Sequence, residues 1–257
     1  MTIIKHRVNF VTLILLLTAA VFCTISEGFA APDYAREQRW AAEITPTIIV
    51  GEPVYLKQKN EHQFLGIYAE ADNAVTCLVI AHGMGLHPDW GMISTLRQEL
   101  VDYGYSTLSI QMPVLAANAG YERYPELFTD ASERLQLAVA FLKSKGCQYI
   151  AIVSHSNGSR MSRVFMTSKP KNVDAWIALS LTQGDTFEGV KVPVLDLYGE
   201  NDLPHVLESS AKRKASLENN TLSKQKVIAD ADHFFAGYEE EMIKDVKGYL
   251  DDLKFLQ

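Results

Sequence analysis

Cysteine is scarce in this sequence, and long runs of positive charge are missing. Three cysteines occur among 257 residues, and the excess of acidic over basic residues gives a formal net charge of −7. Without a basic run, the chain offers no electrostatic footprint for nucleic acid or for an anionic membrane. Internal repeats, low-complexity tracts and long linkers are also missing, so we expect one globular domain behind a short leader.

Residues 1–30 have the composition of a leader rather than of a folded segment. A basic start is followed by an almost unbroken apolar run over residues 8–25, and small residues then precede a cleavage position after Ala30. This is the pattern of a secretory signal peptide. We therefore expect residues 31–257 to act in the periplasm or outside the cell, with no stable membrane association after cleavage. An uncleaved membrane anchor and a lipoprotein attached through Cys23 are the alternatives.

Removal of the leader would leave two cysteines, Cys77 and Cys147. Both are expected in buried strands, but at different offsets from the ends of those strands. Two separate buried thiols are therefore the favoured interpretation. Export would also permit a disulfide between them.

Short apolar runs alternate with amphipathic stretches of helical period along most of the chain. The strands that we expect lie at residues 47–56, 63–69, 75–81, 105–111, 149–153, 173–181, 192–198 and 225–229. Strands that alternate with helices in this way predict an α/β fold, with a mostly parallel central sheet and helices on both faces. Only about ten residues, 182–191, separate two of these strands, which leaves no room for a large lid domain there.

The residues directly after each strand are the candidates for chemistry, because ligands bind outside the carboxyl ends of parallel strands. Ser154-His155-Ser156-Asn157-Gly158 follows the strand at 149–153 and is close to the G-x-S-x-G nucleophile elbow. In that turn Ser156 is the nucleophile, and the Asn157 N–H helps to hold an oxyanion. A strand-to-helix turn in which small residues serve packing alone is the alternative.

His82-Gly83-Met84-Gly85 follows the strand at 75–81. An HG turn at this point supplies the second oxyanion donor in hydrolases of this kind, here the Met84 N–H. We expect His82 and Gly83 to line the substrate site. A glycine turn with a locally bonded histidine is the alternative, and the spacing of His82, His87 and Asp89 fits no zinc pattern.

An acid and a base follow the last two strands. Asp202 comes shortly after the strand at 192–198, and His233 comes shortly after the last strand. A carboxylate orients the histidine, and the histidine takes the proton of the serine. Glu200 and Asp196 are the competing acids, and Asp202 is favoured.

With these residues in place, the chain resembles the α/β-hydrolase superfamily from about residue 47 to its C-terminus. The order Ser, Asp, His is the order that this fold uses. The segment at 79–90 is similar to an uncharacterised family of exported bacterial α/β-hydrolase-like proteins. The resemblance implies a triad of Ser156, Asp202 and His233, and it carries no known substrate. Ser154 in place of glycine departs from the commonest elbow and leaves the geometry of the turn open.

The expected function is acyl transfer from a small-molecule ester or thioester, without a cofactor or a metal. Trp90, Tyr121 and Phe234 are expected to form walls of the substrate site. A site without a lid suits a soluble substrate better than a deeply buried lipid tail. The alternatives are an exported peptidase or amidase with the same triad, and a non-catalytic binding module on a hydrolase fold.

Overall fold

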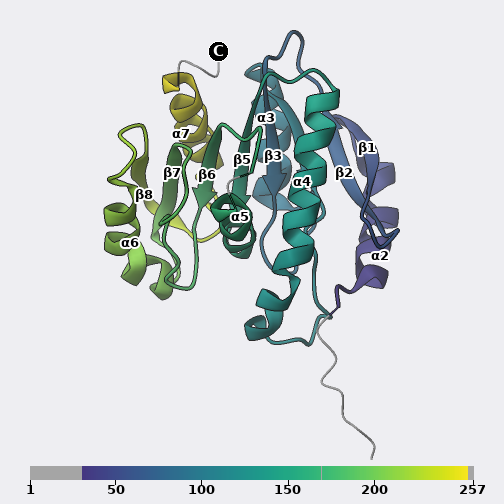
Figure 1. Cartoon of the computed structure of the whole chain (residues 1–257), viewed down its shortest axis with the longest axis horizontal. Helices are drawn as coiled ribbons and strands as arrows, with labels where there is room; N and C mark the ends of the chain where they lie inside the picture. Colours follow the sequence, from purple (N-terminus) through teal and green to yellow (C-terminus); the bar gives the residue numbers. More distant parts are fainter. Residues whose placement is uncertain (1–30, 169, 254–257) are drawn as a thin grey trace, which may run out of the picture.

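The structure is a computed structural model that describes residues 31–168 and 170–253 (Figure 1). The expected signal peptide therefore lies outside the described residues. Within the described part of the chain, no helix is long and apolar enough to cross a membrane.

One eight-stranded sheet forms the centre of the molecule, with the strand order β1-β2-β4-β3-β5-β6-β7-β8. The strand β2 runs antiparallel to both β1 and β4, and the other neighbouring strands are parallel. Their carboxyl ends therefore meet at one edge of the sheet. The strands are β1 (Glu52–Lys57), β2 (Gln63–Ala69), β3 (Thr76–Ala81), β4 (Ser106–Ile110), β5 (Tyr149–His155), β6 (Ala175–Leu179), β7 (Val194–Asn201) and β8 (Lys224–Asp232).

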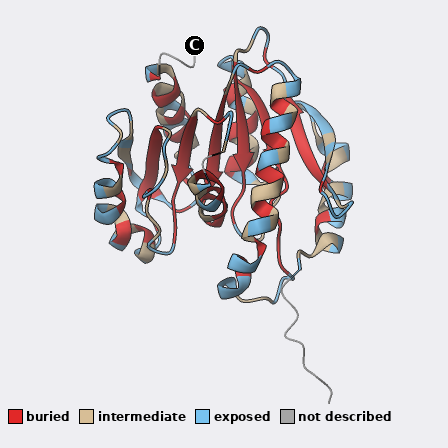
Figure 2. Cartoon of the chain, in the orientation of Figure 1, coloured by how far each residue is buried: buried red, intermediate tan, exposed pale blue. Residues whose placement is uncertain are grey.

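Helices cover both faces of the sheet, and the central strands are buried between them (Figure 2). One apolar core packs α4, α5 and the end of α6 against the sheet, and the opposite core packs α3 and α7. A smaller cluster joins α2 to β2. The helices are α2 (Tyr34–Ile44), α3 (Gly91–Asp102), α4 (Phe128–Ser144), α5 (Asn157–Thr167), α6 (Pro204–Leu217) and α7 (Glu239–Asp252), with short 3₁₀ turns η1 (Thr45–Thr47) and η2 (Tyr121–Leu127).

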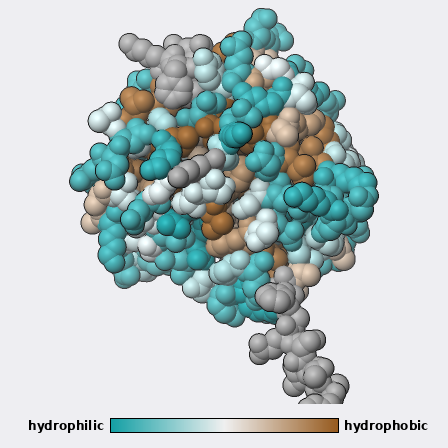
Figure 3. Space-filling view, in the orientation of Figure 1, coloured by the Kyte–Doolittle hydropathy of each residue, from teal (hydrophilic) through white to brown (hydrophobic). Residues whose placement is uncertain are grey.

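The outer surface on the side of α4 and α5 is mainly hydrophilic around its outline, with apolar residues between the hydrophilic ones (Figure 3). The alternation of buried strands and half-exposed helices agrees with the α/β architecture predicted from the sequence. Residues 180–193, between β6 and β7, contain neither helix nor strand. The expected absence of a large lid at this point is therefore what the structure shows.

One predicted strand begins later than expected. The sequence favours a strand from residue 47, but Thr45–Thr47 forms a 3₁₀ turn and β1 starts at Glu52. Gly51 lies between the two with a φ of +88°, and a Cβ atom there would lie 2.5 Å from the carbonyl oxygen of Tyr68. The chain bends at this glycine before it can pair with β2, so the apolar residues before the bend do not extend the strand.

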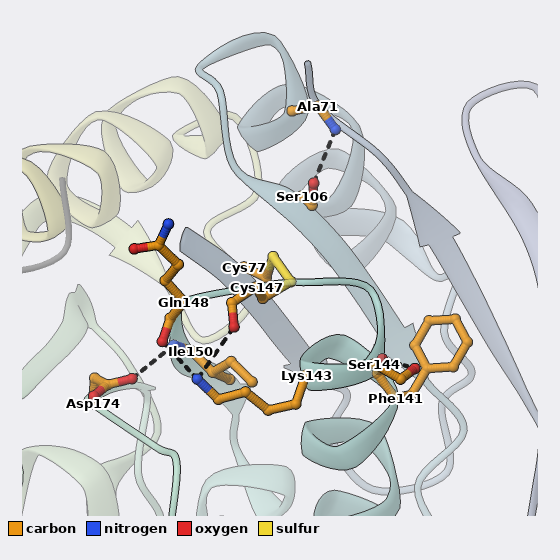
Figure 4. Close-up of a disulfide and its surroundings, with 10 residues drawn as sticks. All are labelled: Ala71, Cys77, Ser106, Phe141, Lys143, Ser144, Cys147, Gln148, Ile150 and Asp174. Carbon is orange, nitrogen blue, oxygen red and sulfur yellow. Dashed lines mark hydrogen bonds between the residues drawn. A yellow bond between two sulfur atoms is a disulfide. The ribbon is translucent and has the colours of Figure 1, made fainter. Parts of the chain in front are cut away.

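The two cysteines form a disulfide, so the favoured interpretation of two separate thiols is wrong. The Cα atoms of Cys77 and Cys147 lie 5.9 Å apart. Cys147 belongs to the turn between α4 and β5 rather than to a strand, and Lys143 Nζ donates hydrogen bonds to the carbonyl groups of Cys147 and Gln148 (Figure 4). This turn brings Cys147 beside the start of β3. Because Cys147 is not in a strand, its offset from a strand end does not predict whether it can reach Cys77.

Replacing both Cys77 and Cys147 with Ser is expected to lower the free energy of unfolding by about 4 kcal/mol, because the bond closes a long loop in the unfolded chain. The sequence separation is 70 residues. Urea unfolding of the oxidised protein and the double variant measures the difference. Dithiothreitol should cause a similar loss in the wild type and none in the variant. Equal stability of the oxidised and reduced wild type would contradict this prediction.

Candidate active site

Ser156 occupies a strained turn between β5 and α5. Its φ and ψ are 56° and −123°, a conformation that residues with a side chain rarely adopt. The Ser156 N–H donates to the carbonyl of Leu179 at the end of β6 (2.9 Å). A Cβ atom on Gly158 would lie 2.3 Å from the carbonyl oxygen of His82, so only glycine allows α5 to start this close to β3. The turn raises the serine hydroxyl above the carboxyl edge of the sheet.

Ser154 stands where the elbow pattern usually has its first glycine, and the structure gives its side chain a definite place. The Ser154 side chain is buried, and its Oγ accepts a hydrogen bond from Trp176 Nε1 (2.8 Å). It also donates to Ser159 Oγ (3.2 Å). The hydroxyl thus joins the strand to its neighbour β6 and to α5. The turn at Ser156 keeps its strained backbone with a serine in this position.

The three residues of the predicted triad form one hydrogen-bonded chain. The Ser156 hydroxyl donates to His233 Nε2 (2.9 Å), and His233 Nδ1 donates to Asp202 Oδ1 (2.6 Å). Both His233 and Asp202 are buried. They follow β8 and β7 directly, so three strand ends deliver the three groups to one edge. This arrangement allows the histidine to remove the serine proton while the carboxylate stabilises the resulting imidazolium.

Asp202 is held as a carboxylate by several donors. Ser180 Oγ donates to its Oδ2 (2.5 Å), and the backbone N–H groups of Leu203 and Gly199 donate at 2.7 and 3.4 Å. Burial alone would raise the pKa of Asp202, but the hydrogen bonds from His233 and Ser180 outweigh it and hold that pKa below its usual value. The competing acids lie elsewhere. Asp196 is fully buried against Arg213, and Glu200 accepts from the backbone of Asp230.

Ser180 was missed by sequence reasoning, although a signal for it existed. It directly follows β6, at the same edge of the sheet as the triad. Serine is common in loops for many reasons, so its type gave no indication of a bond to Asp202. Its backbone has a φ of 51°, and its N–H donates to Leu197 of β7 (2.8 Å). Both features fix its hydroxyl beside the carboxylate.

Replacing Ser180 with Ala is expected to lower kcat about tenfold, because a hydrogen bond to a charged group is worth about 1.5 kcal/mol. Steady-state kinetics with an activated ester, measured at pH 8, provides the comparison. Ser168→Ala, a change at an exposed serine beyond α5, is the matched control and should leave kcat unaltered. Unchanged kcat in Ser180→Ala would show that the other donors to Asp202 suffice.

Two backbone N–H groups in the segments beside Ser156 have no acceptor among the described residues, as an oxyanion hole requires. Neither the Met84 nor the Asn157 N–H donates a hydrogen bond to any described residue. Asn157 is the first residue of α5, so its N–H also lies at the positive end of the helix dipole. Gly83 lies against the nucleophile, since a Cβ on it would be 3.2 Å from Ser156 Cβ. The predicted oxyanion loop and the predicted nucleophile are thus neighbours.

The expected substrate-contacting residues divide into three groups. Trp90 and Phe234 lie together, with ring centroids 5.3 Å apart, and Phe234 also contacts His233 at 5.1 Å. Phe234 is 41% exposed beside the triad. Tyr121 donates through its hydroxyl to Gln183 Oε1 (2.8 Å), which ties η2 to the segment between β6 and β7. His82 was expected to line the substrate site, but its side chain is fully buried.

His155 is a further residue that sequence reasoning passed over. It is buried directly before the nucleophile, and its Nε2 donates to the backbone carbonyl of His233 (2.9 Å). Burial and the neighbouring His233 lower the pKa of His155 to about 4. The neutral ring therefore ties the loop of the base to the strand that carries Ser156. Its position inside the elbow pattern was the only available signal.

Within residues 31–168 and 170–253, no group of three or more His, Cys, Asp or Glu side chains is placed to hold a metal ion. His87 and Asp89 make other contacts. Asp89 accepts from Arg97 and Ser94, and the His87 ring lies 5.6 Å from that of Trp40.

Comparison with known proteins agrees with the fold. Residues 31–126 match a family model described as a protein of unknown function, DUF3530. A search of curated proteins gives no match. A dienelactone hydrolase from Anabaena variabilis is similar in structure, with a TM-score of 0.63 and 20% identity over 78% of this chain and 98% of that one.

Two further structures are similar at lower identity. Est1E from Butyrivibrio proteoclasticus has a TM-score of 0.62 and 15% identity, over 78% of this chain and 98% of its own. A serine hydrolase without a lid from Xanthomonas campestris has a TM-score of 0.65 and 12% identity, over 80% of this chain and 96% of its own. The strand order, the helices on both faces and these likenesses together show that the chain has the α/β-hydrolase fold.

Proposed function

We propose that the protein is a serine hydrolase that transfers the acyl group of a small, soluble ester or thioester to water. The observation that carries the proposal is the hydrogen-bonded chain from Ser156 through His233 to Asp202. Chance rarely places a strained serine, a histidine in contact with it and a buried carboxylate in this order. The structural neighbours include esterases, which supports the same class of reaction.

The reaction proceeds in two acyl transfers. His233 Nε2 takes the proton of Ser156 as Oγ attacks the carbonyl carbon, and the amides of Met84 and Asn157 hold the oxyanion. Collapse of this intermediate breaks the bond to the alcohol or thiol, which leaves with the proton from His233. Water, deprotonated by His233, then attacks the acyl-serine and releases the acid.

A disulfide supports the proposal that the protein acts outside the cytoplasm. The bond between Cys77 and Cys147 is of a kind that persists in oxidising compartments. Cleavage after Ala30 would leave intact the cap of α2, where Asp33 accepts from the N–H of Arg36 (2.9 Å). We therefore propose a periplasmic or secreted enzyme. The protein recovered from the periplasm should then have the mass of residues 31–257, with Ala31 as its first residue.

A fluorophosphonate probe tests the proposed function directly. An activated serine displaces fluoride and forms a stable bond to phosphorus, whereas an idle serine does not react. Labelling of the purified protein should map to the peptide that contains Ser156, and it should disappear in Ser156→Ala but persist in Ser168→Ala. A folded wild-type protein that resists the probe and hydrolyses no ester would refute the proposal and favour a binding module.

The absence of a large lid predicts a preference for short acyl chains. The apolar surface available beside the triad includes Trp90 and Phe234, and the segment between β6 and β7 adds no covering helix. kcat/KM for p-nitrophenyl esters is expected to fall by about tenfold or more from acetate or butyrate to palmitate, because little surface is present to bury the long chain. Equal turnover of both would contradict a small soluble substrate.

A further inference from the structure

The peptide unit between Gly83 and Met84 carries one of the two oxyanion donors, and its orientation is fixed from behind. The carbonyl oxygen of Gly83 accepts a hydrogen bond from His82 Nδ1 (2.8 Å). A trans peptide is planar, so its C=O and N–H point in opposite directions. With the carbonyl directed at the buried His82 ring, the Met84 N–H must point away from it.

The hydrogen bonds around the ring assign one tautomer to His82. Its Nε2 lies 2.9 Å from the backbone N–H of Met112 and 2.9 Å from the side-chain amide of Gln111. A backbone N–H can only donate, so Nε2 accepts and carries no proton. The single ring proton therefore resides on Nδ1, where it is donated to Gly83. Burial lowers the pKa of His82 to about 3, so the ring is neutral at working pH.

A buried chain of polar groups connects this histidine to α4 and α2. The carbonyl of Gln111 accepts from Arg134 Nη1 (3.0 Å), and the same nitrogen donates to Glu37 Oε2 of α2 (3.0 Å). Arg134, Glu37 and Gln111 are all buried. The polar path thus runs from the N-terminal helix through α4 and the end of β4 to the oxyanion loop. Any buried histidine needs hydrogen-bond partners. Here one of those partners is the carbonyl of the peptide unit that carries the Met84 N–H.

A second contact from α2 holds the same loop two peptides further on. Arg36 donates to the carbonyl of Gly85 (3.4 Å) and to that of Leu115 (2.8 Å). The residues from 83 to 85 are thereby held at both ends. Preorganised backbone donors are effective because they need not rotate as charge develops.

We propose that His82 is the positioning residue of the oxyanion hole, which holds the Gly83 carbonyl so that the Met84 N–H faces the developing charge. This inference rests on the proposed function and extends it. His82 touches no substrate. Its contribution is to the transition state alone, so its loss should lower kcat and leave KM unchanged.

Two substitutions test separately the hydrogen-bond donor of the His82 ring, Nδ1, and its acceptor, Nε2. His82→Asn keeps an N–H group near the place of Nδ1, whereas His82→Gln keeps an acceptor near the place of Nε2 and loses the donor. His82→Gln is expected to lower kcat about 10- to 100-fold. This decrease is no larger than the one that follows removal of a complete oxyanion donor. His82→Asn should retain most of kcat. His87→Gln, in the same loop, is the matched control and should not alter it.

A trifluoromethyl ketone reports on the oxyanion hole itself. Addition of Ser156 Oγ to its carbonyl gives a hemiketal whose oxyanion occupies the hole. Its Ki should rise by the same factor as kcat/KM falls in His82→Gln, while the KM for the ester stays constant. Equal losses of kcat in the Asn and Gln variants, or an effect confined to KM, would overturn the proposal.

A measurement on the wild-type protein avoids the risk that a variant fails to fold. Nitrogen chemical shifts of labelled histidine at pH 7 should show the Nδ1-protonated tautomer for His82. The amide proton of Met84 should move downfield when the trifluoromethyl ketone binds. A proton on Nε2 in an enzyme that hydrolyses esters would overturn this inference alone, whereas a wild type that does not react with the fluorophosphonate would refute the proposed function.

Discussion

Replacing Asp202 with Asn is expected to lower kcat by about 10⁴-fold with little change in the fold. Four donors converge on the carboxylate: His233 Nδ1 and the Leu203 N–H on one oxygen, and Ser180 Oγ and the Gly199 N–H on the other. An amide has only one acceptor oxygen, so its NH₂ group must face one of these pairs.

Either orientation places the NH₂ group against a backbone N–H that cannot accept, that of Leu203 on the His233 side or that of Gly199 on the Ser180 side. In both orientations the negative charge that stabilises the imidazolium is lost. When the NH₂ faces His233, it forces Nδ1 to accept, and the ring proton moves to Nε2. A protonated Nε2 cannot take the proton of Ser156. Catalysis then fails although every heavy atom remains in place.

Kinetics of Asp202→Asn with an activated ester, at pH values from 6 to 9, measures this loss. Glu200→Gln is the matched control, since Glu200 is an exposed carboxylate near the same strand end. It should retain full kcat. The assignment of the acid is wrong if Glu200→Gln loses as much activity as Asp202→Asn. Circular dichroism should show that both variants keep the fold.

The sequence predicted which residues lie together in the candidate triad, because periodicity identifies strand ends. In a parallel sheet every such end lies at one edge, so residues that follow different strands meet there. Ser156, Asp202 and His233 were found in this way, and the structure brings them together. The fold class followed from the same alternation of elements.

What the sequence could not predict lies in the loops and in the partners of buried polar groups. The disulfide depends on how the turn before β5 curves, which no periodicity encodes. The contact of Ser180 with Asp202 depends on a positive φ at a residue other than glycine. His82 was expected to face the substrate, but its orientation is decided by Gln111 and Met112, which a linear reading does not connect to it.

The free energy of unfolding is expected to fall steeply as the pH is lowered from 6.5 toward 4. Burial lowers the pKa of His82 to about 3, and burial with the nearby His233 lowers that of His155 to about 4, against an ordinary value of 6.5. In this interval the unfolded chain binds a proton at each histidine and the folded chain does not. The two residues therefore contribute a loss of about 2.7 kcal/mol per pH unit.

The sign follows from the direction of both pKa values. A histidine whose folded pKa is lowered favours the folded state above its unfolded pKa, and that contribution declines below pH 6.5. Urea unfolding at pH 7.0, 6.0 and 5.0 measures the slope. His155→Gln removes one of the two titrating histidines. The part of the slope of unfolding free energy against pH that comes from His82 and His155 should then fall by about half. An identical slope in wild type and variant would contradict the assignment of a buried neutral His155.

Activity in the same interval separates unfolding from titration of the site. The folded protein keeps His82 and His155 mainly neutral above about pH 4, so the hydrogen bonds that hold the Gly83 carbonyl and the His233 loop persist in that range. These two residues can therefore reduce total activity between pH 6.5 and 4 only by lowering the folded fraction. When activity is divided by the folded fraction, His82 and His155 should contribute nothing to the pH dependence that remains.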